Sequence, residues 1–550
     1  MSKHEFNEIR IAIERNNPAI YRDESLCIKC GQCRNVCRNE IAVGKMYDLS
    51  YTNDTAICIH CGQCANVCPV SSIQEVDDVA KIKAALNDPN KIVVISTSPS
   101  VRAALGEEFN MPVGSFVEGK MVAALRALNI PYVLDTNFAA DLTIMEEANE
   151  LIERITKKNK PLPQFTSCCP AWVKFVETFY PEFIPNISTA KSPISMQGPT
   201  IKTYFASKNQ LDPKKIVNVA LTPCTAKKYE ILRDEMNDAG KQLGIEGMRD
   251  MDYVITTREL ARWLKAENID FDALEPAPYD SFMGAASGAG VIFGNTGGVM
   301  EAAVRTAYHE ITKDNLPSDM MKLTDLRGLE GIKEASLDIN GVPVKVAVVH
   351  GTENARKLLD KIKLNEAHYD FIEVMTCRGG CIAGGGQPKS AVPMNDEIRQ
   401  ARIDALYTQD EKQTLRFSHD NPEVQTVYQE FYKAPLSELA EKMLHTHYQD
   451  KSAILNGHVM DLSEPTKQWK CLICGYIAEM DEIPSDYICP LCGVGKDLFE
   501  EIKPIEETEA ETKTTGWKCS ICGYVAEVEE LPNDYICPLC GVGKDLFNKE

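Results

Sequence analysis

The chain has 550 residues, of which 44% are hydrophobic and 25% charged, and its formal net charge is -21. This length is too great for one hydrophobic core, so we expect three or four domains. The negative charge disfavours nucleic-acid and anionic-lipid partners. No apolar run approaches the about 20 residues of a membrane-spanning helix, and the charged start, MSKHEFNEIRIAIERNNP, is unlike a secretory signal. We therefore expect a cytoplasmic protein that binds neither nucleic acid nor membrane.

The first seventy-odd residues contain two copies of one cysteine pattern, CIKCGQCRNVC and CIHCGQCANVC. In a C-x2-C-x2-C-x3-C run, three thiolates hold one 4Fe-4S cube and the fourth reaches the other cube. Zinc is the alternative, but zinc sites do not need this doubled, interlocking run. His60 lies inside the second run, and we expect it to be a solvent-facing loop residue without a role. The predicted ligands are Cys27, Cys30, Cys33 and Cys68 for one cube, and Cys58, Cys61, Cys64 and Cys37 for the other.

From about Val79 the sequence becomes that of a mixed globular domain. The segments KIVVIST (91–97), VNVALT (217–222) and VKVAVVH (344–350) are strand candidates, and DLTIMEEANELIERITKK (141–158) has the periodicity of an amphipathic helix. Strands that alternate with helical stretches favour an α/β core. The predicted fold class is multidomain α/β (α+β).

Five cysteines of this central region lie in the segments FTSCCPAWVKF (165–175), LTPCTAKKYE (221–230) and FIEVMTCRGGCIAGGGQP (371–388). Four converging thiolates would make another cubane site, and the fifth would be free as a thiol with a tunable pKa. Glycines in the third segment let backbone approach a bulky inorganic group. A buried Lys227 would require an anion. The alternatives are inert buried cysteines and an ordinary surface lysine. The five are Cys168, Cys169, Cys224, Cys377 and Cys381.

Two nearly identical modules follow, at 469–499 and 517–547. They start 48 residues apart and differ at six of 31 positions. The segment between them is acidic and poor in large apolar residues, which predicts a flexible tether. Each module has CxxCG and CPxCG knuckles, which form a tetrahedral thiolate site for iron or zinc, with aromatic residues as a small core. The predicted ligands are Cys471, Cys474, Cys489, Cys492, Cys519, Cys522, Cys537 and Cys540.

The three central segments resemble the signature motifs of FeFe-hydrogenases, and the resemblance covers roughly residues 20 to 450. The active centre of that family, the H-cluster, joins a 4Fe-4S cube to a diiron unit with carbon monoxide, cyanide and a bridging dithiolate amine. By this resemblance Cys169, Cys224, Cys377 and Cys381 hold the cube, Cys381 also bridges to the diiron unit, and Cys168 is the proton donor. Lys227, Pro99 and Ser100 match positions that bind the cyanides, and Met375 matches a methionine that packs over the diiron unit.

The resemblance also implies a proton path from Cys168 through Glu147, Ser188 and Glu150. The two glutamates are three apart on the predicted helix and therefore share one face. The alternative is a solvated acidic face. Two positions depart from the family pattern, because Thr222 stands where well-studied members have methionine and Ser98 where many have alanine. We expect these cofactor-binding residues to change the surroundings of the centre.

The carboxy-terminal modules resemble short rubredoxins with one iron each, and zinc remains the competitor. The predicted domains are a two-cluster ferredoxin-like domain (1–78), a hydrogenase catalytic domain (79–460), two rubredoxin-like domains (466–502 and 516–550) and the tether (503–515). The resemblance implies reversible interconversion of protons and electrons with dihydrogen, electron relay through the 4Fe-4S clusters and the rubredoxin irons, a ferredoxin or other electron carrier, and hydrogenase maturation proteins. The alternatives are a hydrogenase-like iron-sulfur assembly protein, a hydrogen sensor and a rubredoxin-linked reductase.

Overall fold

The chain forms two compact units in the structure, which is a computed structural model. One holds 1–464 with 490–493, and the other holds 465–489 with 494–550. The structure describes 9–317, 320–339 and 341–458, and then 468–473, 477–479, 483, 487–489, 494–502, 517–519, 525–526, 531–532, 535–536 and 543–549. The predicted tether and the predicted ligands Cys474, Cys492, Cys522, Cys537 and Cys540 lie outside the described residues.

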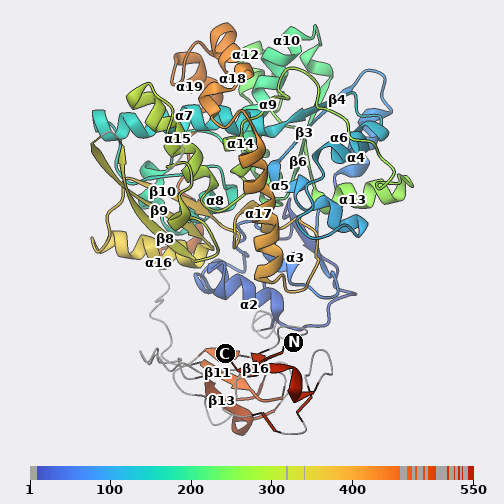
Figure 1. The fold of residues 1–550 in the computed structure, drawn as a ribbon, viewed down its shortest axis with the longest axis vertical. Helices are drawn as coiled ribbons and strands as arrows, with labels where there is room; N and C mark the ends of the chain where they lie inside the picture. The colour runs from blue at the N-terminus through green and yellow to red at the C-terminus, as the bar shows by residue number, and fades with distance from the viewer. Residues whose placement is uncertain are drawn as a thin grey trace. The chain divides into compact units, whose positions relative to one another are not determined.

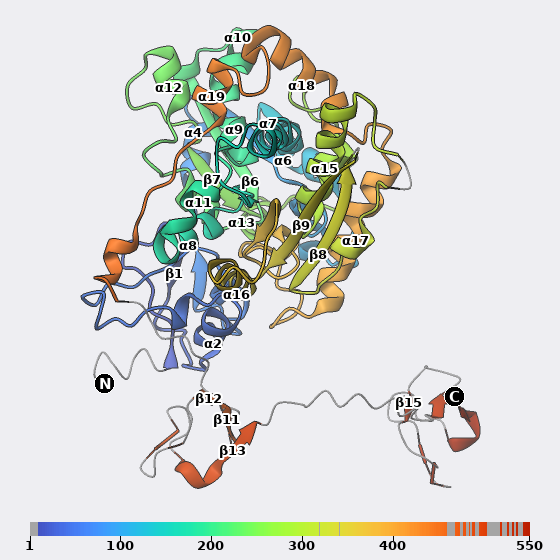
Figure 2. The same cartoon turned by 90° about the vertical axis from the view of Figure 1, so that its left-hand side faces the viewer.

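A parallel four-stranded sheet forms one side of the first unit (Figures 1 and 2). The inner strands β3 and β6 are almost wholly buried, which fits their mostly apolar sequences. The predicted strands at 91–97 and 217–222 are confirmed. In the order β4-β3-β6-β7, the strands are β4 (Tyr132–Asp135), β3 (Ile92–Thr97), β6 (Ile216–Thr222) and β7 (Tyr253–Thr256).

A second four-stranded sheet lies on the other side of this unit (left in Figure 1). β5, β10 and β9 run parallel, and β8 pairs antiparallel with β9. The predicted strand at 344–350 is confirmed as the end of β9. In the order β5-β10-β9-β8, the strands are β5 (Gln164–Phe165), β10 (Phe371–Met375), β9 (Val342–His350) and β8 (Ile332–Ile339).

Helix α7 (Thr136–Lys157) packs between the two sheets against α9, α14 and α15 (Figure 1). The carboxylate of Asp135 caps its start by accepting a hydrogen bond from Asn137 N at 2.8 Å. The helix was predicted at 141–158 and begins five residues earlier. Because Glu147 and Glu150 are buried, the alternative of a solvated acidic face is wrong.

Further helices complete the first unit. Those before β7 are α4 (Val79–Leu86), α5 (Pro99–Arg102), α6 (Glu118–Ala127), α8 (Pro170–Phe179), α9 (Pro193–Thr200), α10 (Ala206–Lys208), α11 (Ala226–Glu230) and α12 (Asp238–Leu243). Those after β7 are α13 (Thr257–Ala266), α14 (Gly288–Ile292), α15 (Gly298–Thr312), α16 (Thr352–Lys363), α17 (Asp396–Lys412), α18 (Pro422–Val427) and α19 (Glu438–Leu444).

The amino-terminal cysteine runs form a small lobe of the same unit. Strand β1 (Ile20–Arg22) pairs antiparallel with β2 (Ile73–Glu75), and the runs carry the short helices α2 (Gln32–Asn39) and α3 (Gln63–Asn66). Gly62 precedes α3 with φ +71°, and a Cβ there would lie 2.4 Å from Thr225 Oγ1, so only glycine fits this contact.

His60 differs from its predicted solvent-facing position. Its ring is buried and stacks on Tyr229 with centroids 4.5 Å apart, and its Nε2 lies 2.8 Å from Lys174 Nζ. Burial, followed by the charges of Lys174 and Lys451, holds its pKa well below the ordinary value. The expectation was wrong because the run packs against α8 and α11 instead of water.

The second unit holds the two repeated modules, each with one antiparallel three-stranded sheet. The first contains β11 (Gln468–Cys471), β12 (Ile477–Glu479) and β13 (Phe499–Ile502), and the second contains β14 (Trp517–Cys519), β15 (Val525–Ala526) and β16 (Phe547–Lys549). The rings of Tyr487 and Phe499 meet edge to face at 5.4 Å, and Tyr535 and Phe547 repeat this contact. The aromatic core is therefore present where the structure describes it.

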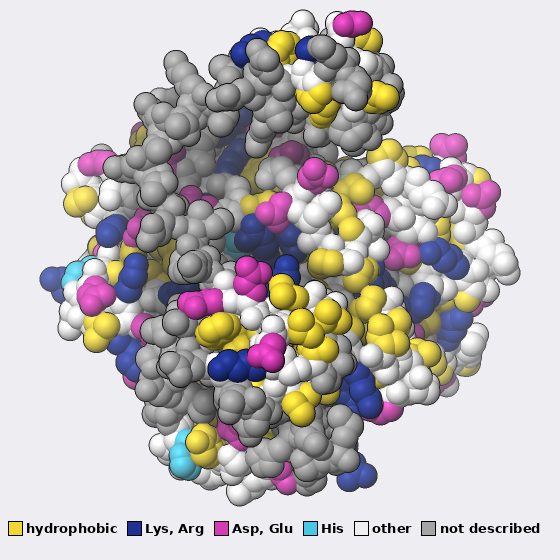
Figure 3. Space-filling view, turned by 90° about the horizontal axis from the view of Figure 1, so that it is seen from below, with side chains coloured by type: hydrophobic (Ala, Val, Ile, Leu, Met, Phe, Trp, Pro, Cys, Tyr) yellow, Lys and Arg dark blue, Asp and Glu magenta, His cyan; other side chains and the backbone are white. Residues whose placement is uncertain are grey.

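The surface has mixed charge where it can be seen. Figure 3 shows acidic, basic and hydrophobic side chains interspersed on one face, among the atoms that it colours. None of the helices in the described ranges combines the length and apolar character that crossing a bilayer takes.

Candidate active site

The central cavity lies where strands of both sheets end. β3 and β6 of one sheet and β5 and β10 of the other all point their carboxyl ends toward it, which is where ligands bind in parallel α/β sheets. Each strand is followed by a segment that lines the cavity. These segments include Ser98 to Ser100 after β3, Cys168 to Pro170 after β5, Thr222 to Cys224 at the end of β6, and Met375 to Cys377 at the end of β10.

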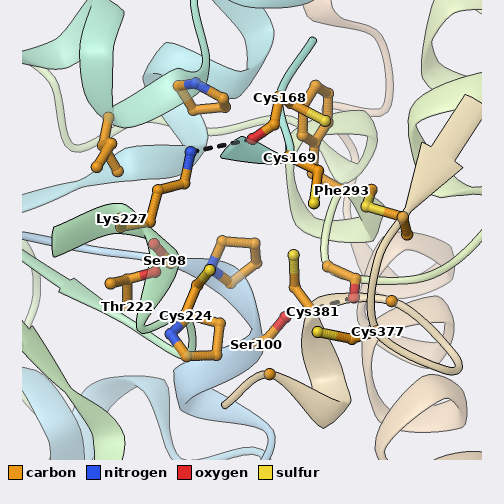
Figure 4. A pocket seen from close by; sticks show the side chains of 18 of the residues that line it. Ser98, Ser100, Cys168, Cys169, Thr222, Cys224, Lys227, Phe293, Cys377 and Cys381 are labelled. Atoms are coloured by element: carbon orange, nitrogen blue, oxygen red, sulfur yellow. Dashed lines mark hydrogen bonds between the residues drawn. The ribbon is translucent and has the colours of Figure 1, made fainter. Parts of the chain in front are cut away.

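All five central cysteines line this one cavity (Figure 4). Cys168 and Cys169 come from the segment between β5 and α8, and Pro170 begins α8 directly after them. Burial, followed by repulsion from the Cys169 thiolate, raises the pKa of Cys224 to about 12. Thiolates can persist together here only if a positive group neutralises them, and bound iron does so.

Lys227 is the buried cation of the cavity wall. Its Nζ lies 2.7 Å from Glu230 Oε2 and donates a hydrogen bond to the Cys168 carbonyl at 3.0 Å (Figure 4). Burial alone would lower its pKa, but Glu230 and then Cys224 raise the pKa above the ordinary value. Lys227 therefore carries its charge into the cavity, and the surface-lysine alternative is wrong.

A buried carboxyl group lies behind Cys168. Both oxygens of Glu147 are buried, and neither has a hydrogen-bond partner among the described residues. Burial, followed by repulsion from Glu150, raises the Glu147 pKa to about 8. Burial, followed by the Glu147 carboxyl, raises the pKa of Cys168 well above that of a free thiol. Both groups are therefore protonated near neutral pH.

Glu150 lies one helical turn further along α7 and is ionised. Its Oε2 accepts a hydrogen bond from the Ser188 hydroxyl at 2.7 Å, and its Oε1 accepts from Arg154 at 2.8 Å and from Lys160 at 2.9 Å. Burial opposes ionisation, but Arg154 and Lys160 outweigh burial and lower the pKa to about 2. The structure thus joins Ser188 to Glu150, and no hydrogen bond joins Ser188 to Glu147 in it.

Three neighbours of this site were missed from the sequence. Arg154 follows Glu150 at i+4 spacing, so this ion pair was predictable from the helix period. Lys160 gave no such signal. Gln63 of the second amino-terminal run donates a hydrogen bond to Cys377 Sγ at 3.1 Å, across 314 positions of the chain. Only the fold brings Gln63 and Cys377 together.

The glycines of GGCIAGGGQP act differently from the prediction at two positions. A Cβ on Gly385 would lie 2.3 Å from the Cys61 carbonyl oxygen, and one on Gly386 would lie 2.4 Å from Thr256 Cβ. These glycines therefore allow protein segments to pack together. Gly380 and Gly384 line the cavity itself, as expected.

One cysteine of the first amino-terminal run lies with three of the second. Cys37 of the first run lines a cavity together with Cys58, Cys61 and Cys64 of the second run. In the described part of the chain, no three His, Cys, Asp or Glu side chains are arranged to share a single metal ion. Thiols that surround a cavity match a multi-iron cluster better than a mononuclear zinc site.

The two cavities fit iron-sulfur groups by the chemistry of their walls. The central one combines five thiols and a charged lysine with apolar side chains such as Phe293 and Met375, and the unpartnered Glu147 carboxyl lies behind Cys168. Such a wall holds an electron-rich metal cluster, shields it from water and supplies proton carriers. The fold and site therefore define an iron-sulfur oxidoreductase.

Comparisons with known proteins identify the family. Residues 91–385 match the family described as "Iron only hydrogenase large subunit, C-terminal domain", and 396–451 match "Iron hydrogenase small subunit". Residues 19–69 match a 4Fe-4S dicluster domain, and 469–500 and 517–548 each match "Rubrerythrin, rubredoxin-like domain". The chain belongs to the iron-only hydrogenase family.

Individual relatives support the same assignment. Iron hydrogenase 1 of Clostridium pasteurianum is 43% identical over 452 residues, which cover 79% of this chain and 77% of that protein. The periplasmic [Fe] hydrogenase large subunit of Nitratidesulfovibrio vulgaris is 47% identical and covers 66% and 85%. The structure of an apo [FeFe]-hydrogenase HydA1 variant from Chlamydomonas reinhardtii matches with a TM-score of 0.60 and 39% identity, over 68% of this chain and 99% of that one.

The predictions of family, fold class and cofactors are thus confirmed. The chain is an iron hydrogenase that interconverts dihydrogen with protons and electrons at an H-cluster, and its 4Fe-4S clusters relay the electrons. Rubredoxin-like domains complete it. Protons, dihydrogen and an electron carrier are its reaction partners.

Proposed function

We propose that the five central cysteines have two different roles. Cys169, Cys224, Cys377 and Cys381 would hold the cube, Cys381 would also hold the diiron unit, and Cys168 would remain a thiol that donates protons. The observation that carries this proposal is the convergence of five thiols on one cavity, with the protonated Glu147 carboxyl, which has no hydrogen-bond partner among the described residues, behind Cys168. The bound H-cluster supplies the redox chemistry, and the protein positions it and delivers protons.

The rest of the wall would position the diiron unit. Lys227 would offer a positive charge to its cyanide ligands, and Met375 at the end of β10 would pack an apolar side chain against it. Pro99 and Ser100 lie at the start of α5 and would bind the cyanides from there. The Ser100 hydroxyl has only a 3.5 Å hydrogen bond to the Gly294 carbonyl, so it can turn to a ligand. Ser98 and Thr222 line the same wall.

Protons would move between Cys168 and the surface through Glu147, Ser188 and Glu150. Glu147 carries a proton at neutral pH and can pass it to the Cys168 thiol. Ser188 lies beside Glu150, and the partly exposed Lys160 places this carboxylate near solvent. A small rotation of Glu147 or one water would close the gap to Ser188.

The amino-terminal lobe, proposed as residues 1–78, would hold two 4Fe-4S clusters with the predicted crossing of Cys37 and Cys68. The catalytic domain would then span 79–460. The modules at 466–502 and 516–550, joined by the tether 503–515, would hold one iron each and offer a second electron port. Zinc is the alternative metal, because four thiolates bind either one.

We infer three partners or settings from the same features. A ferredoxin or similar one-electron carrier suits cubane clusters as an electron donor or acceptor. Hydrogenase maturation proteins would build the diiron unit. The third is a setting, and the one we propose is the cytoplasm.

A pair of cysteine variants tests the central assignment. After anaerobic maturation, Cys168→Ser should keep the infrared bands of carbon monoxide and cyanide but lose hydrogen evolution from reduced viologen. Cys169→Ser should lose the iron of the cube. Loss of the bands in Cys168→Ser, or full hydrogen evolution by it, would contradict the division between four ligands and one proton donor.

A further inference from the structure

Ser98 and Thr222 form the last rung of the parallel sheet that faces the cavity. In the β3–β6 register, Ser96 pairs with Ala220 and Thr97 with Leu221. The Ser98 N–H donates to the Leu221 carbonyl at 2.9 Å, which extends the ladder past the end of β3. The two side chains therefore lie next to each other on the wall that also carries Lys227 (Figure 4).

Both residues of this rung are buried, and both of their hydroxyls lack a partner among the described residues. Ser98 is 8% exposed and Thr222 is 2% exposed, and neither hydroxyl makes a hydrogen bond to any described residue. Other hydroxyls nearby are used by the protein, since Thr225 donates to the His60 carbonyl at 2.8 Å. Hydroxyls of buried residues normally make hydrogen bonds, so both of these can donate one to a group in the cavity.

The two oxygens are also open to the cavity. The Thr136 side chain borders the same cavity. Its hydroxyl oxygen, however, is fully buried and has no hydrogen-bond partner among the described residues. The Ser98 and Thr222 oxygens are not closed off in this way. They can therefore reach a group inside the cavity, whereas the Thr136 hydroxyl cannot.

The surroundings of the rung select a small anion that accepts hydrogen bonds. Lys227 contributes a positive charge on the same wall, while Pro99, Ile194 and Phe293 make its neighbourhood apolar. A cyanide nitrogen is an anionic acceptor that suits two hydroxyls beside an ammonium group. Carbon monoxide is a poor acceptor and would gain little from them.

We propose that the Ser98 and Thr222 hydroxyls donate hydrogen bonds to a cyanide ligand of the diiron unit and thereby withdraw electron density from its iron. This inference rests on the proposed placement of the diiron unit. Less electron density on the iron weakens back-donation to carbon monoxide. The rung should therefore raise the stretching frequencies of the carbon monoxide and cyanide ligands and make the diiron unit easier to reduce.

Infrared spectroscopy of the anaerobically matured full chain tests the rung. Thr222→Val removes the hydroxyl and keeps the shape, so the carbon monoxide and cyanide bands should move to lower wavenumber. Thr222→Ser restores the hydroxyl and should restore the bands. Ser98→Ala should shift them in the same direction, and the double variant should shift them further. Thr136→Val is the matched control and should leave the bands in place.

The outcomes separate this inference from the function on which it rests. Unchanged bands in Thr222→Val and Ser98→Ala would overturn the proposed hydrogen bonds. Equal shifts in Thr222→Val and Thr222→Ser would also overturn them, because the shift would then come from changed packing and not from loss of the hydroxyl. Loss of the bands in Thr222→Val, with the bands kept in Thr222→Ser, would support the proposed hydrogen bonds, because the hydroxyl would then be needed to hold the diiron unit. Absence of the bands from the unsubstituted, matured protein would defeat the proposed function itself.

Discussion

Glu147→Gln removes the protonated carboxyl behind Cys168 and keeps its size. With a pKa of about 8, Glu147 is protonated at pH 7 by roughly 10 to 1 and ionised at pH 9 by roughly the same ratio. Because this pKa is raised, the Glu147 proton is present below about pH 8 and lost above it. Proton delivery through Glu147 should therefore fall roughly tenfold between pH 7 and pH 9. The variant should lose about 10²- to 10⁴-fold in hydrogen evolution, the usual contribution of a positioned proton donor.

Two measurements check this reasoning. Infrared difference spectra should show a protonated carboxyl band that titrates near pH 8 and is missing from Glu147→Gln. Hydrogen evolution is then compared with Glu153→Gln, a control on the same helix whose carboxylate is a third exposed and pairs with Lys157. A Glu147→Gln enzyme that keeps at least half of its activity, or a carboxyl band that titrates near the ordinary value of Glu, would refute the role of Glu147.

Three further predictions concern the clusters. Cys37→Ser should remove one amino-terminal cube, measured as iron content and electron paramagnetic resonance, and a complete pair of cubes would contradict the crossing of the two runs. Gln63→Leu removes the hydrogen bond to Cys377 Sγ, so the potential of the catalytic cube should fall by roughly 50 mV in a redox titration; an unchanged potential would argue against this contact. Lys227→Met leaves Glu230 buried without its cation, so diiron loading should drop several-fold by infrared band intensity, and normal loading would show that the charge is dispensable.

Much of the fold was accessible from the sequence, and so was the convergence of the five central cysteines on one cavity. β3 and β6 are mostly apolar and rich in β-branched residues, so the local sequence pattern was enough to predict them as buried strands. The cysteine spacings predicted a crossing of the two amino-terminal runs, which stays a prediction, and the structure places Cys37 in one cavity with Cys58, Cys61 and Cys64.

The remainder depends on packing between distant segments. His60 is buried because α8 and α11 cover its run, and nothing near it in the sequence indicates this. A glycine is needed at position 385 because its backbone contacts Cys61 of the amino-terminal lobe, and not because it approaches the cofactor. The start of α7 was missed because Asp135, the cap, ends a strand, so the helix begins before its amphipathic pattern does.

The most direct test of the account is the infrared spectrum of the full chain after anaerobic maturation, recorded with hydrogen evolution from reduced viologen. The account predicts carbon monoxide and cyanide bands together with hydrogen evolution. Protein with its cubes loaded, but with neither bands nor hydrogen, would contradict the placement of a diiron unit in the cavity of Cys168 and Lys227.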